Sequence, residues 1–432
     1  MKIPLFAVSL LLLCLPVVAQ FKNIKLDEQH NGDYMCEPSI AINPKNPLNI
    51  VAASVLNNIY VTKDGGATWK KIEVVSSMGV YGDPSLIADG GGTFYFFHLS
   101  DPTGGKGGYD SEKLDRIVVQ RSDDGGETWT DGTAIGLNHP KDQDKQWPAI
   151  DSKGNLTLTW TQFDTYGSKD RNCHSNILMS TSKNGSKWSE PIVMSQIPGN
   201  CVDNDSTVMG AMPAILFDGK MFVVWALNEK IFLDRSFDGN LWLSNDIAVQ
   251  DQKGGWDLAI AGHDRCNGLP VLMTDRSKSG YRGNLYLLWA DQKNGKDNTD
   301  VWFTKSNNYG DNWSTPLNVS VTRNNHQYLP WMTVDQTTGY IYIVYYDRSR
   351  YDDLKTDVVL AWSTDGGSSF RNATISETPF EPSPSSFFGD YTNIAAHKGV
   401  ITPIWTRMDS GKTSVWTTVI RHDELEALNN KK

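Results

Sequence analysis

Short runs of alternating apolar and polar residues recur along the whole chain, and glycine, asparagine and aspartate separate them. Seven stretches share one pattern, a short strand, often opened by proline, then a tight turn and a strongly apolar strand. They span residues 37–54, 83–99, 147–163, 212–227, 269–291, 329–347 and 390–407. Their β-branched and aromatic residues predict seven β-hairpins. Helical spacing is confined to the tail "DELEALNN" at 423–430.

A second element alternates with these hairpins and places a glycine three residues before an aromatic residue. "VTKDGGATW" ends at Trp69 and "RSDDGGETW" at Trp129, and further copies end at Trp188, Trp242, Trp313 and Phe370. An aspartate stands five residues before the aromatic in three copies, as Asp64, Asp124 and Asp365. We interpret this aspartate as a turn residue that accepts backbone hydrogen bonds, and Asp123 as its solvated neighbour.

Each pair of elements predicts a four-stranded unit, an inner hairpin followed by an outer one. Units of this length repeated in series are typical of a β-propeller. We therefore predict an all-β, seven-bladed propeller of four-stranded antiparallel blades over residues 20–422, with a short tail at 423–432. The segment "FKNIKLDEQH" at 21–30 is expected to complete the last blade. Six blades remain the alternative if one hairpin belongs to a neighbouring unit.

The first 19 residues combine a lysine, an apolar run and a small-residue end, which predicts a signal peptide cut after Ala19. We therefore expect a secreted or periplasmic protein. The formal net charge of −10 argues against nucleic acid as a partner. No later apolar run approaches the roughly 20 residues of a membrane helix, so we expect no membrane span. We also expect the protein to be a monomer.

Four cysteines follow the signal peptide: Cys36, Cys173, Cys201 and Cys266. An even number in an exported chain permits two disulfides with three pairings, and the alternative is free, buried thiols. Cys173 and Cys201 flank one hairpin-sized segment, which favours that pair.

Most of the 15 tryptophans are expected to pack between blades, because they recur at equivalent positions. Trp160, Trp225, Trp289 and Trp405 share one such position on the second strand. Trp147, Trp256 and Trp331 lie outside this pattern, and Trp147 is a candidate platform for a ligand.

Topology separates the two faces of the predicted propeller. The glycine–tryptophan turns lie on one face, and the long irregular loops lie on the other, where binding is expected. Glu37, Asp83 and Asp390 begin inner strands of blades one, two and seven on this loop-rich face. Converging carboxylates there fit three alternatives: an acid and base pair, a calcium site, or a solvated mouth. No other cofactor is expected.

The glycine–tryptophan element resembles the Asp box, or BNR repeat, of the sialidase superfamily, and its six copies cover almost the whole predicted propeller. The resemblance implies a carbohydrate-active propeller whose site holds an arginine clamp, a tyrosine nucleophile and carboxylates. Tyr391 stands where the family's tyrosine is expected, and Arg265, Arg348 and Arg407 are candidate substrate-binding cations. Glu37 departs from the pattern, because it stands where the family has its first clamp arginine.

Two functions from different classes follow. The first is a glycoside hydrolase, exo-sialidase-like or a divergent relative, with Glu37, Asp83, Asp390 and Tyr391 as catalytic candidates and a glycan or glycoconjugate as substrate. The alternative is a non-catalytic propeller that binds protein or polysaccharide through its loop-rich face.

Overall fold

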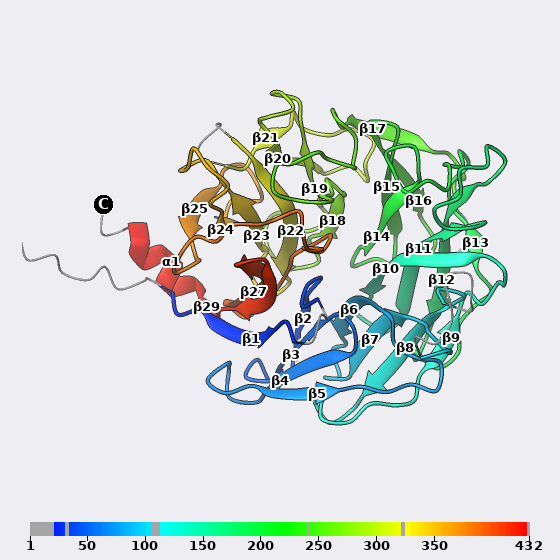
Figure 1. Cartoon of the computed structure of the whole chain (residues 1–432), viewed down its shortest axis with the longest axis horizontal. Coiled ribbons are helices and arrows are strands. Elements are labelled where there is room, and N and C mark those ends of the chain that lie inside the picture. Colours follow the sequence, from blue (N-terminus) through cyan, green and yellow to red (C-terminus); the bar gives the residue numbers. More distant parts are fainter. Residues whose placement is uncertain (1–20, 31–33, 105–112, 240–241, 321–324, 430–432) are drawn as a thin grey trace, which may run out of the picture.

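Seven antiparallel sheets surround a central axis in the computed structural model, which describes residues 21–30, 34–104, 113–239, 242–320 and 325–429 (Figure 1). The predicted seven-bladed, all-β propeller with four-stranded blades is confirmed, and the six-bladed alternative is wrong. The predicted signal peptide lies outside the described residues.

Blades one to four each contain four consecutive strands. Blade one contains β2 (Ser39–Ile42), β3 (Ile50–Ser54), β4 (Asn58–Thr62) and β5 (Lys70–Glu73). Blade two contains β6 (Gly82–Ala88), β7 (Phe94–Leu99), β8 (Ile117–Ser122) and β9 (Thr133–Ile135). Blade three contains β10 (Asp142–Ile150), β11 (Leu156–Phe163), β12 (Ser175–Ser182) and β13 (Ile192–Val193). Blade four contains β14 (Met209–Ile215), β15 (Met221–Leu227), β16 (Lys230–Ser236) and β17 (Ile247–Asp251).

The remaining blades complete the ring. Blade five contains β18 (Val271–Thr274), β19 (Leu285–Asp291), β20 (Asp300–Ser306) and β21 (Leu317–Asn318). Blade six contains β22 (Gln327–Asp335), β23 (Tyr340–Asp347), β24 (Asp357–Ser363) and β25 (Arg371–Thr374). Blade seven contains β26 (Asn393–His397), β27 (Val400–Asp409), β28 (Lys412–Thr417), β29 (Ile420–Arg421) and β1 (Ile24–Glu28).

The predicted helical tail is confirmed as α1 (His422–Asn429). It projects from the side of the ring near β1 (Figure 1). Within the described part of the chain, no helix has the length and apolar character needed to cross a membrane.

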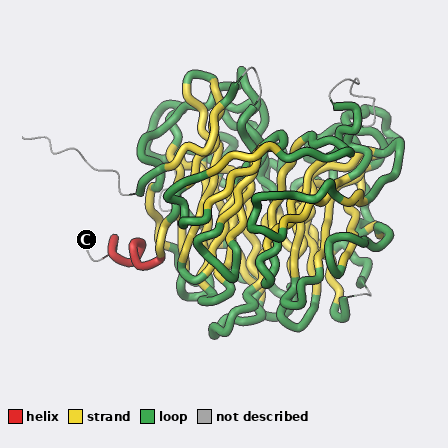
Figure 2. The backbone as a smooth tube through the Cα atoms, turned by 90° about the horizontal axis from the view of Figure 1, so that it is seen from below, coloured by secondary structure: helices red, strands yellow, loops and turns green. Residues whose placement is uncertain are grey.

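Blades one to six pair their strands in chain order from the axis outward, as the hairpin pattern predicts, and blade seven does so for β26, β27 and β28. The strands run between two layers of loops (Figure 2). Turns between the first and second strands and between the third and fourth strands share one face, called here the Asp-box face. Loops between the second and third strands, and links between blades, share the loop-rich face. Each inner strand therefore runs beside the axis, with one end at the Asp-box face and the other at the loop-rich face.

Tryptophans fill the space between neighbouring blades. Trp160, Trp225, Trp289 and Trp405 are each at most 1% exposed, as expected for a repeated packing position. The indole nitrogen of Trp160 donates to Gln143 Oε1 over 2.7 Å, so that its polar group is satisfied inside the core. Burial of such large side chains supplies much of the cohesion between blades.

The ring is closed by β1, which pairs antiparallel with β28 as the outermost strand of blade seven. This confirms the sequence prediction that residues 21–30 complete the last blade. Asp27 on β1 accepts a hydrogen bond from Tyr60 of blade one over 2.9 Å and an ion pair from Lys71 over 2.7 Å. The closing strand therefore binds to both the last and the first blade.

The aspartate of the repeated turn is a structural residue, as the sequence predicts. Asp124 Oδ1 accepts hydrogen bonds from the backbone nitrogens of Glu127 and Thr128, each over 3.0 Å. Burial opposes ionisation of Asp124, but these bonds and those from the Thr128 and Ser122 hydroxyls outweigh it and lower its pKa to about 2. The neighbouring Asp123 is exposed and pairs with Arg121 over 2.7 Å.

We predict that Asp124→Ala lowers the free energy of unfolding at neutral pH by about 1 kcal/mol, because two backbone donors lose their acceptor. The pKa of Asp124 is depressed by folding, so its contribution is complete above the unfolded pKa of about 3.9 and disappears as the pH falls through about 2. Denaturant unfolding at several pH values measures both effects. The matched control, Asp123→Ala, should stay within about 0.5 kcal/mol of wild type. Equal losses in the two variants would contradict the assignment.

Candidate functional site

Bulges at the start of the inner strands aim charged side chains at the axis. The pairing of β6 with β7 skips Asp83 and Pro84, and the pairing of β10 with β11 skips Lys145 and Gln146. Asp83 and Lys145, the first skipped residues, have φ of 50° and 52°. Glu37, just before β2, has φ of 51°. Non-glycine residues seldom adopt this conformation, and they concentrate at functional sites.

The side chains converge on one ammonium group. Lys145 Nζ lies 2.7 Å from Asp390 Oδ2, 3.0 Å from Asp83 Oδ2 and 3.4 Å from Glu37 Oε1. The Lys145 side chain is only 5% exposed. Glu37, Asp83, Lys145 and Asp390 form what we call the carboxylate cluster, to which blades one, two, three and seven contribute. The three acids were predicted from the sequence to lie close together, whereas Lys145 between them was not predicted.

Arg265 supplies a second cation at the edge of the cluster. It lies in the link between β17 and β18, and its guanidinium binds both carboxylate oxygens of Asp390. It also donates to Asp203 Oδ2 over 2.6 Å, and the Tyr166 hydroxyl donates to the same oxygen over 2.6 Å. The Arg265 side chain is 28% exposed, compared with 10% for Asp203 and 0% for Asp390. Tyr166 was not singled out from the sequence, because it lies in a long loop without a repeated counterpart.

The cluster drives the pKa values of its acids apart. Burial raises the pKa of Glu37 well above its usual value, and the positive charge of Lys145 offsets only part of this effect. Burial also acts on Asp390, but the charges of Arg265 and Lys145 outweigh it and lower the pKa of that carboxyl. The pKa of Asp144, next to Lys145, is raised like that of Glu37, chiefly by burial. Carboxyls whose pKa values are shifted in opposite directions therefore share the site, which is an arrangement suited to acid–base catalysis.

Three aromatic rings form a layer next to the cluster. The Tyr391 ring lies 4.9 Å from that of Trp147 and 6.0 Å from that of Trp331, and its centroid is 5.9 Å from Lys145 Nζ. Its hydroxyl donates to the carbonyl of Pro84 over 3.4 Å. Burial, followed by the charges of Glu37 and Asp83, raises the pKa of Tyr391 well above its usual value. Its role as a nucleophile stays a prediction.

The other two predicted arginines lie away from the carboxylate cluster, and the predicted platform Trp147 is buried beside it. Arg348 is 1% exposed and donates to neutral oxygens of Thr356, Ala261 and Tyr328. Arg407 pairs with Asp409 over 2.6 Å and donates to carbonyls of Thr378 and Pro379. Trp147 is 5% exposed and packs against Trp331 at 4.5 Å, so its indole is part of the aromatic layer. Only Arg265 among the three candidate arginines contacts the carboxylate cluster.

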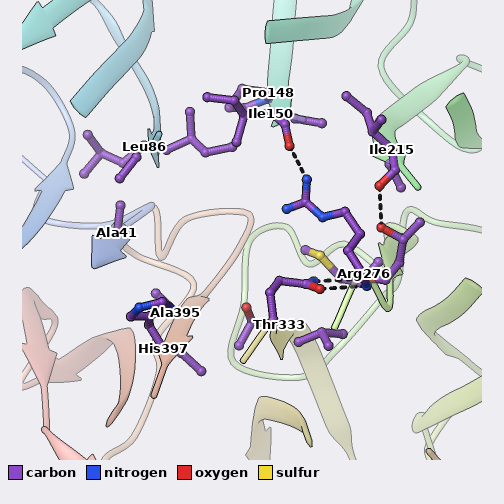
Figure 3. A pocket seen from close by; sticks show the side chains of 18 of the residues that line it. Ala41, Leu86, Pro148, Ile150, Ile215, Arg276, Thr333, Ala395 and His397 are labelled. Carbon is purple, nitrogen blue, oxygen red and sulfur yellow. Dashed lines mark hydrogen bonds between the residues drawn. The ribbon is translucent and has the colours of Figure 1, made fainter. Parts of the chain in front are cut away.

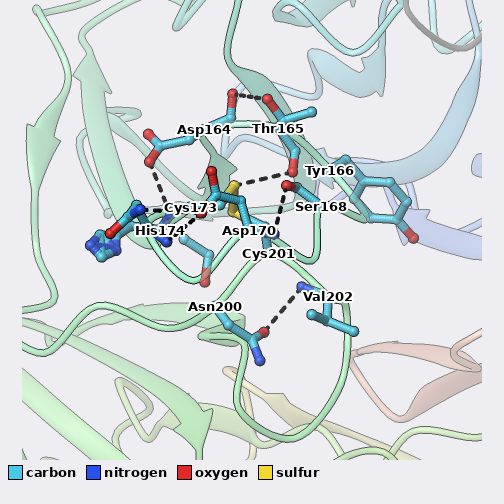
Figure 4. Close-up of a disulfide and its surroundings, with 12 residues drawn as sticks. Asp164, Thr165, Tyr166, Ser168, Asp170, Cys173, His174, Asn200, Cys201 and Val202 are labelled. Atoms are coloured by element: carbon cyan, nitrogen blue, oxygen red, sulfur yellow. Dashed lines mark hydrogen bonds between the residues drawn. A yellow bond between two sulfur atoms is a disulfide. The ribbon is translucent and has the colours of Figure 1, made fainter.

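One disulfide strengthens the loop-rich face. Cys173, in the loop between β11 and β12, is bonded to Cys201, in the link between β13 and β14, which is the pair that the sequence favoured (Figure 4). The second disulfide permitted by the sequence is not formed. Cys36 and Cys266 are free, fully buried thiols, and burial raises the pKa of both.

No group of three or more acidic, histidine or cysteine side chains in the described residues is arranged to hold a metal ion. In the carboxylate cluster, the cations Lys145 and Arg265 already bind the oxygens that a calcium ion would need. The calcium alternative therefore gains no support from the site's donor set.

Comparison with known proteins relates the chain to propellers of several functions. No protein-family model and no curated protein sequence matches it. Among solved structures, it resembles the α-L-arabinofuranosidase Arb93A from Fusarium graminearum, with TM-score 0.51 and 14% identity over 94% of this chain and 98% of that one. It also resembles YCF48 bound to D1 peptide, with TM-score 0.50 and 13% identity over 93% and 96% of the two chains.

The NanB sialidase from Streptococcus pneumoniae is a further match, with TM-score 0.49 and 11% identity over 79% of this chain and 68% of that one. The chain thus has a distant structural likeness to propellers such as Arb93A and YCF48. At these identities the likeness establishes the fold, which is shared by glycoside hydrolases and by proteins of other kinds.

Proposed function

We propose that this chain is an exported glycoside hydrolase that acts on glycans at its loop-rich face. The observation that carries the proposal is the carboxylate cluster, in which Glu37, whose pKa burial raises, and the more open Asp83 converge on Lys145 at 3.4 Å and 3.0 Å. Two neighbouring carboxyl groups, one of them with a raised pKa, are the essential parts of glycosidase chemistry.

Roles within the cluster follow from exposure and contacts. Glu37 is the proton donor to the leaving oxygen, because its pKa is raised. Asp83, whose side chain at 11% exposure is the most open of the three acids, is the carboxylate that faces the sugar. Asp390, with no exposed side-chain surface, holds Lys145 and Arg265 in place. Because all three acids contact one nitrogen, their contacting oxygens lie within about 7 Å of each other, compatible with the spacings used by glycosidases.

The charge of the mouth favours a neutral glycan over a sialic acid. Among the described residues, the acids Asp83, Asp203 and Asp390 outnumber the two cations that they contact, Lys145 and Arg265, even without Glu37 and Asp144, whose pKa values are raised. Arg265 already binds two carboxylates, so it has little capacity left for the carboxylate of a substrate. The resemblance to an arabinofuranosidase, an enzyme of a neutral sugar, supports the same preference.

Activity on a panel of chromogenic glycosides, neutral and sialylated, tests this proposal. We expect turnover of at least one neutral glycoside, no turnover of α-sialosides, and a loss of at least about 100-fold in kcat in Glu37→Gln, which keeps the shape but cannot act as the acid. Thermal melting should be unchanged, because glutamine matches the neutral carboxyl. Tyr391→Phe is measured beside it. Loss of turnover in this variant assigns the nucleophile to Tyr391, and unchanged turnover means that the tyrosine only packs in the aromatic layer.

The second candidate is a non-catalytic propeller that binds protein or polysaccharide. It is favoured by the position of Lys145, which fills the centre of the cluster and leaves the Glu37 side chain only 3% exposed. YCF48 bound to D1 peptide has the same fold and is a peptide complex. Binding on a glycan array without turnover, unaltered by Glu37→Gln, would favour this candidate and overturn the hydrolase.

A further inference from the structure

A cavity of about 550 Å³ lies on the propeller axis at the opposite face from the carboxylate cluster. Inner strands of all seven blades line it, and the turns of the Asp-box face surround its opening (Figure 3). Trp147 and Trp331 line the cavity as well, and they belong to the aromatic layer beside Tyr391. We call this cavity the axial channel. Its volume is in the range of cavities that enclose small organic molecules.

The walls of the axial channel are mainly aliphatic. Side chains that line it include those of Ala41, Leu86, Pro148, Ile150, Ile215 and Ala395 (Figure 3). These aliphatic walls favour an apolar body, and the polar side chains between them, such as those of Ser85 and Thr333, are fewer.

Two arginines interrupt this apolar lining, both from the turn between β18 and β19. The Arg276 side chain reaches across the channel and donates to the carbonyl of Ile150 (Figure 3). The Arg282 guanidinium carbon lies 3.9 Å from the centre of the Phe217 ring. Among the described residues, no carboxylate lies within 4.0 Å of either guanidinium, whereas Arg235 of blade four pairs with Asp311 over 2.7 Å.

Arg276 is a partly buried cation without a carboxylate partner among the described residues. Burial lowers the pKa of Arg276, and the charge of Asp151 offsets only part of this effect. A partly buried cation is stabilised by a nearby anion, so an anion is the ligand that this site favours. A second, independent observation points to a ligand: the hydroxyl of Ser85, which is 1% exposed and lines the channel, has no hydrogen-bond partner in the protein.

We propose that the axial channel binds a small organic carboxylate with an apolar body. The carboxylate lies between Arg276 and Arg282, because the planar guanidinium matches a carboxylate in geometry. The apolar body extends along the aliphatic walls toward Trp147 and Trp331. Asp151 also lines the channel and disfavours a doubly charged ligand, so a monocarboxylate is the preferred class. This site is separate from the proposed glycan site and does not depend on it.

Titration calorimetry with the intact protein tests the proposal, with decanoate as the probe. We expect saturable binding of one decanoate per chain and at least about tenfold weaker binding of 1-decanol, which lacks the charge. N-acetylneuraminic acid, a carboxylate on a polar body, should not bind in the channel. Absence of decanoate binding up to about 1 mM, or equal binding of 1-decanol, overturns the proposal.

Two variants locate the binding. Arg282→Gln removes a cation at the channel and should weaken decanoate binding by about tenfold. Thr333→Phe places a ring in the channel, where Thr333 is half-buried, and should weaken binding at least as much (Figure 3). Arg235→Gln is the matched control, because it removes an arginine that pairs with Asp311, and it should bind like wild type. Each variant is checked by thermal melting. Decanoate binding that is unchanged in both channel variants while their melting is native overturns the proposal.

Discussion

Lys145→Met is expected to lower the free energy of unfolding at neutral pH by about 3–5 kcal/mol, because it removes the shared partner of buried carboxylates. Lys145 Nζ is within 3.4 Å of Glu37, Asp83 and Asp390, and methionine fills a similar volume without the charge. Asp390 retains Arg265, but the other two acids have no second cation among the described ion pairs. Urea unfolding monitored by tryptophan fluorescence measures the loss.

The pH dependence of this loss identifies its cause. Without Lys145, burial raises the pKa of Glu37 further and the pKa of Asp390 loses one of the two charges that lower it, so the folded variant binds protons more readily as the pH falls. The difference from wild type should therefore be largest near pH 7 and shrink toward pH 4–5. Lys141→Met is the control, since Lys141 forms a half-exposed pair with Asp164 and should cost less than about 1 kcal/mol. A loss for Lys145→Met that is independent of pH would contradict the electrostatic explanation.

A chain that begins at Tyr34, and so lacks β1, is expected to lose about 3–5 kcal/mol of stability and to associate with other chains. Phe21, Ile24 and Leu26 contribute roughly 1–2 kcal/mol each through burial. Their loss also leaves β28 as an unpaired edge strand, which is a template for intermolecular pairing. Thermal melting and light scattering measure the two effects.

A synthetic peptide of residues 21–30 provides the control for this experiment. Added in excess, it should pair with β28 and restore both melting and the monomeric state. The same peptide with Leu26→Asp should not restore them, because Leu26 packs against the core between blades one and seven. Wild-type melting of the shortened chain without any peptide would contradict a role for β1 in closing the ring.

Much of the fold could be predicted because the same two sequence elements recur along the chain, and each copy indicates the same local structure. The turn at Asp124 and its counterparts at Asp64 and Asp365 use the same short-range hydrogen bonds, so the local sequence is sufficient to specify them. Closure by residues 21–30 could also be predicted, because the last hairpin pair lacked an outer strand. The pairing of Cys173 with Cys201 followed from their position beside one hairpin.

The carboxylate cluster was only partly predictable, because backbone bulges displace the register between blades. Aligning the blades by their prolines places Trp147 opposite Asp83, since each precedes a proline. In the structure, Pro84 is a skipped residue of its bulge, whereas Pro148 pairs normally within β10. The counterpart of Asp83 is therefore Lys145, two residues earlier than the sequence alignment indicates. A bulge depends on contacts between strands, which a linear pattern does not contain.

The cavity on the Asp-box face was not predicted from the sequence, for a related reason. Its turns are short and regular, so the sequence marks them as structural, and the structure confirms that role for Asp124. The cavity behind them arises from the small residues that several inner strands present to the axis, such as Ala41 and Ala395. No single strand shows this hollow, because it exists only once the ring is assembled.

The position of β1 also constrains the order in which the molecule can be completed. The segment that leaves the ribosome first among the described strands is the partner of β28, which is made almost last. Blades one to six can form during synthesis, but the ring stays open until the C-terminal blade exists and β1 has been kept free for it. Throughout this interval the exposed edge of the nascent chain is vulnerable to aggregation, so the final step of folding is where a chaperone has most to protect.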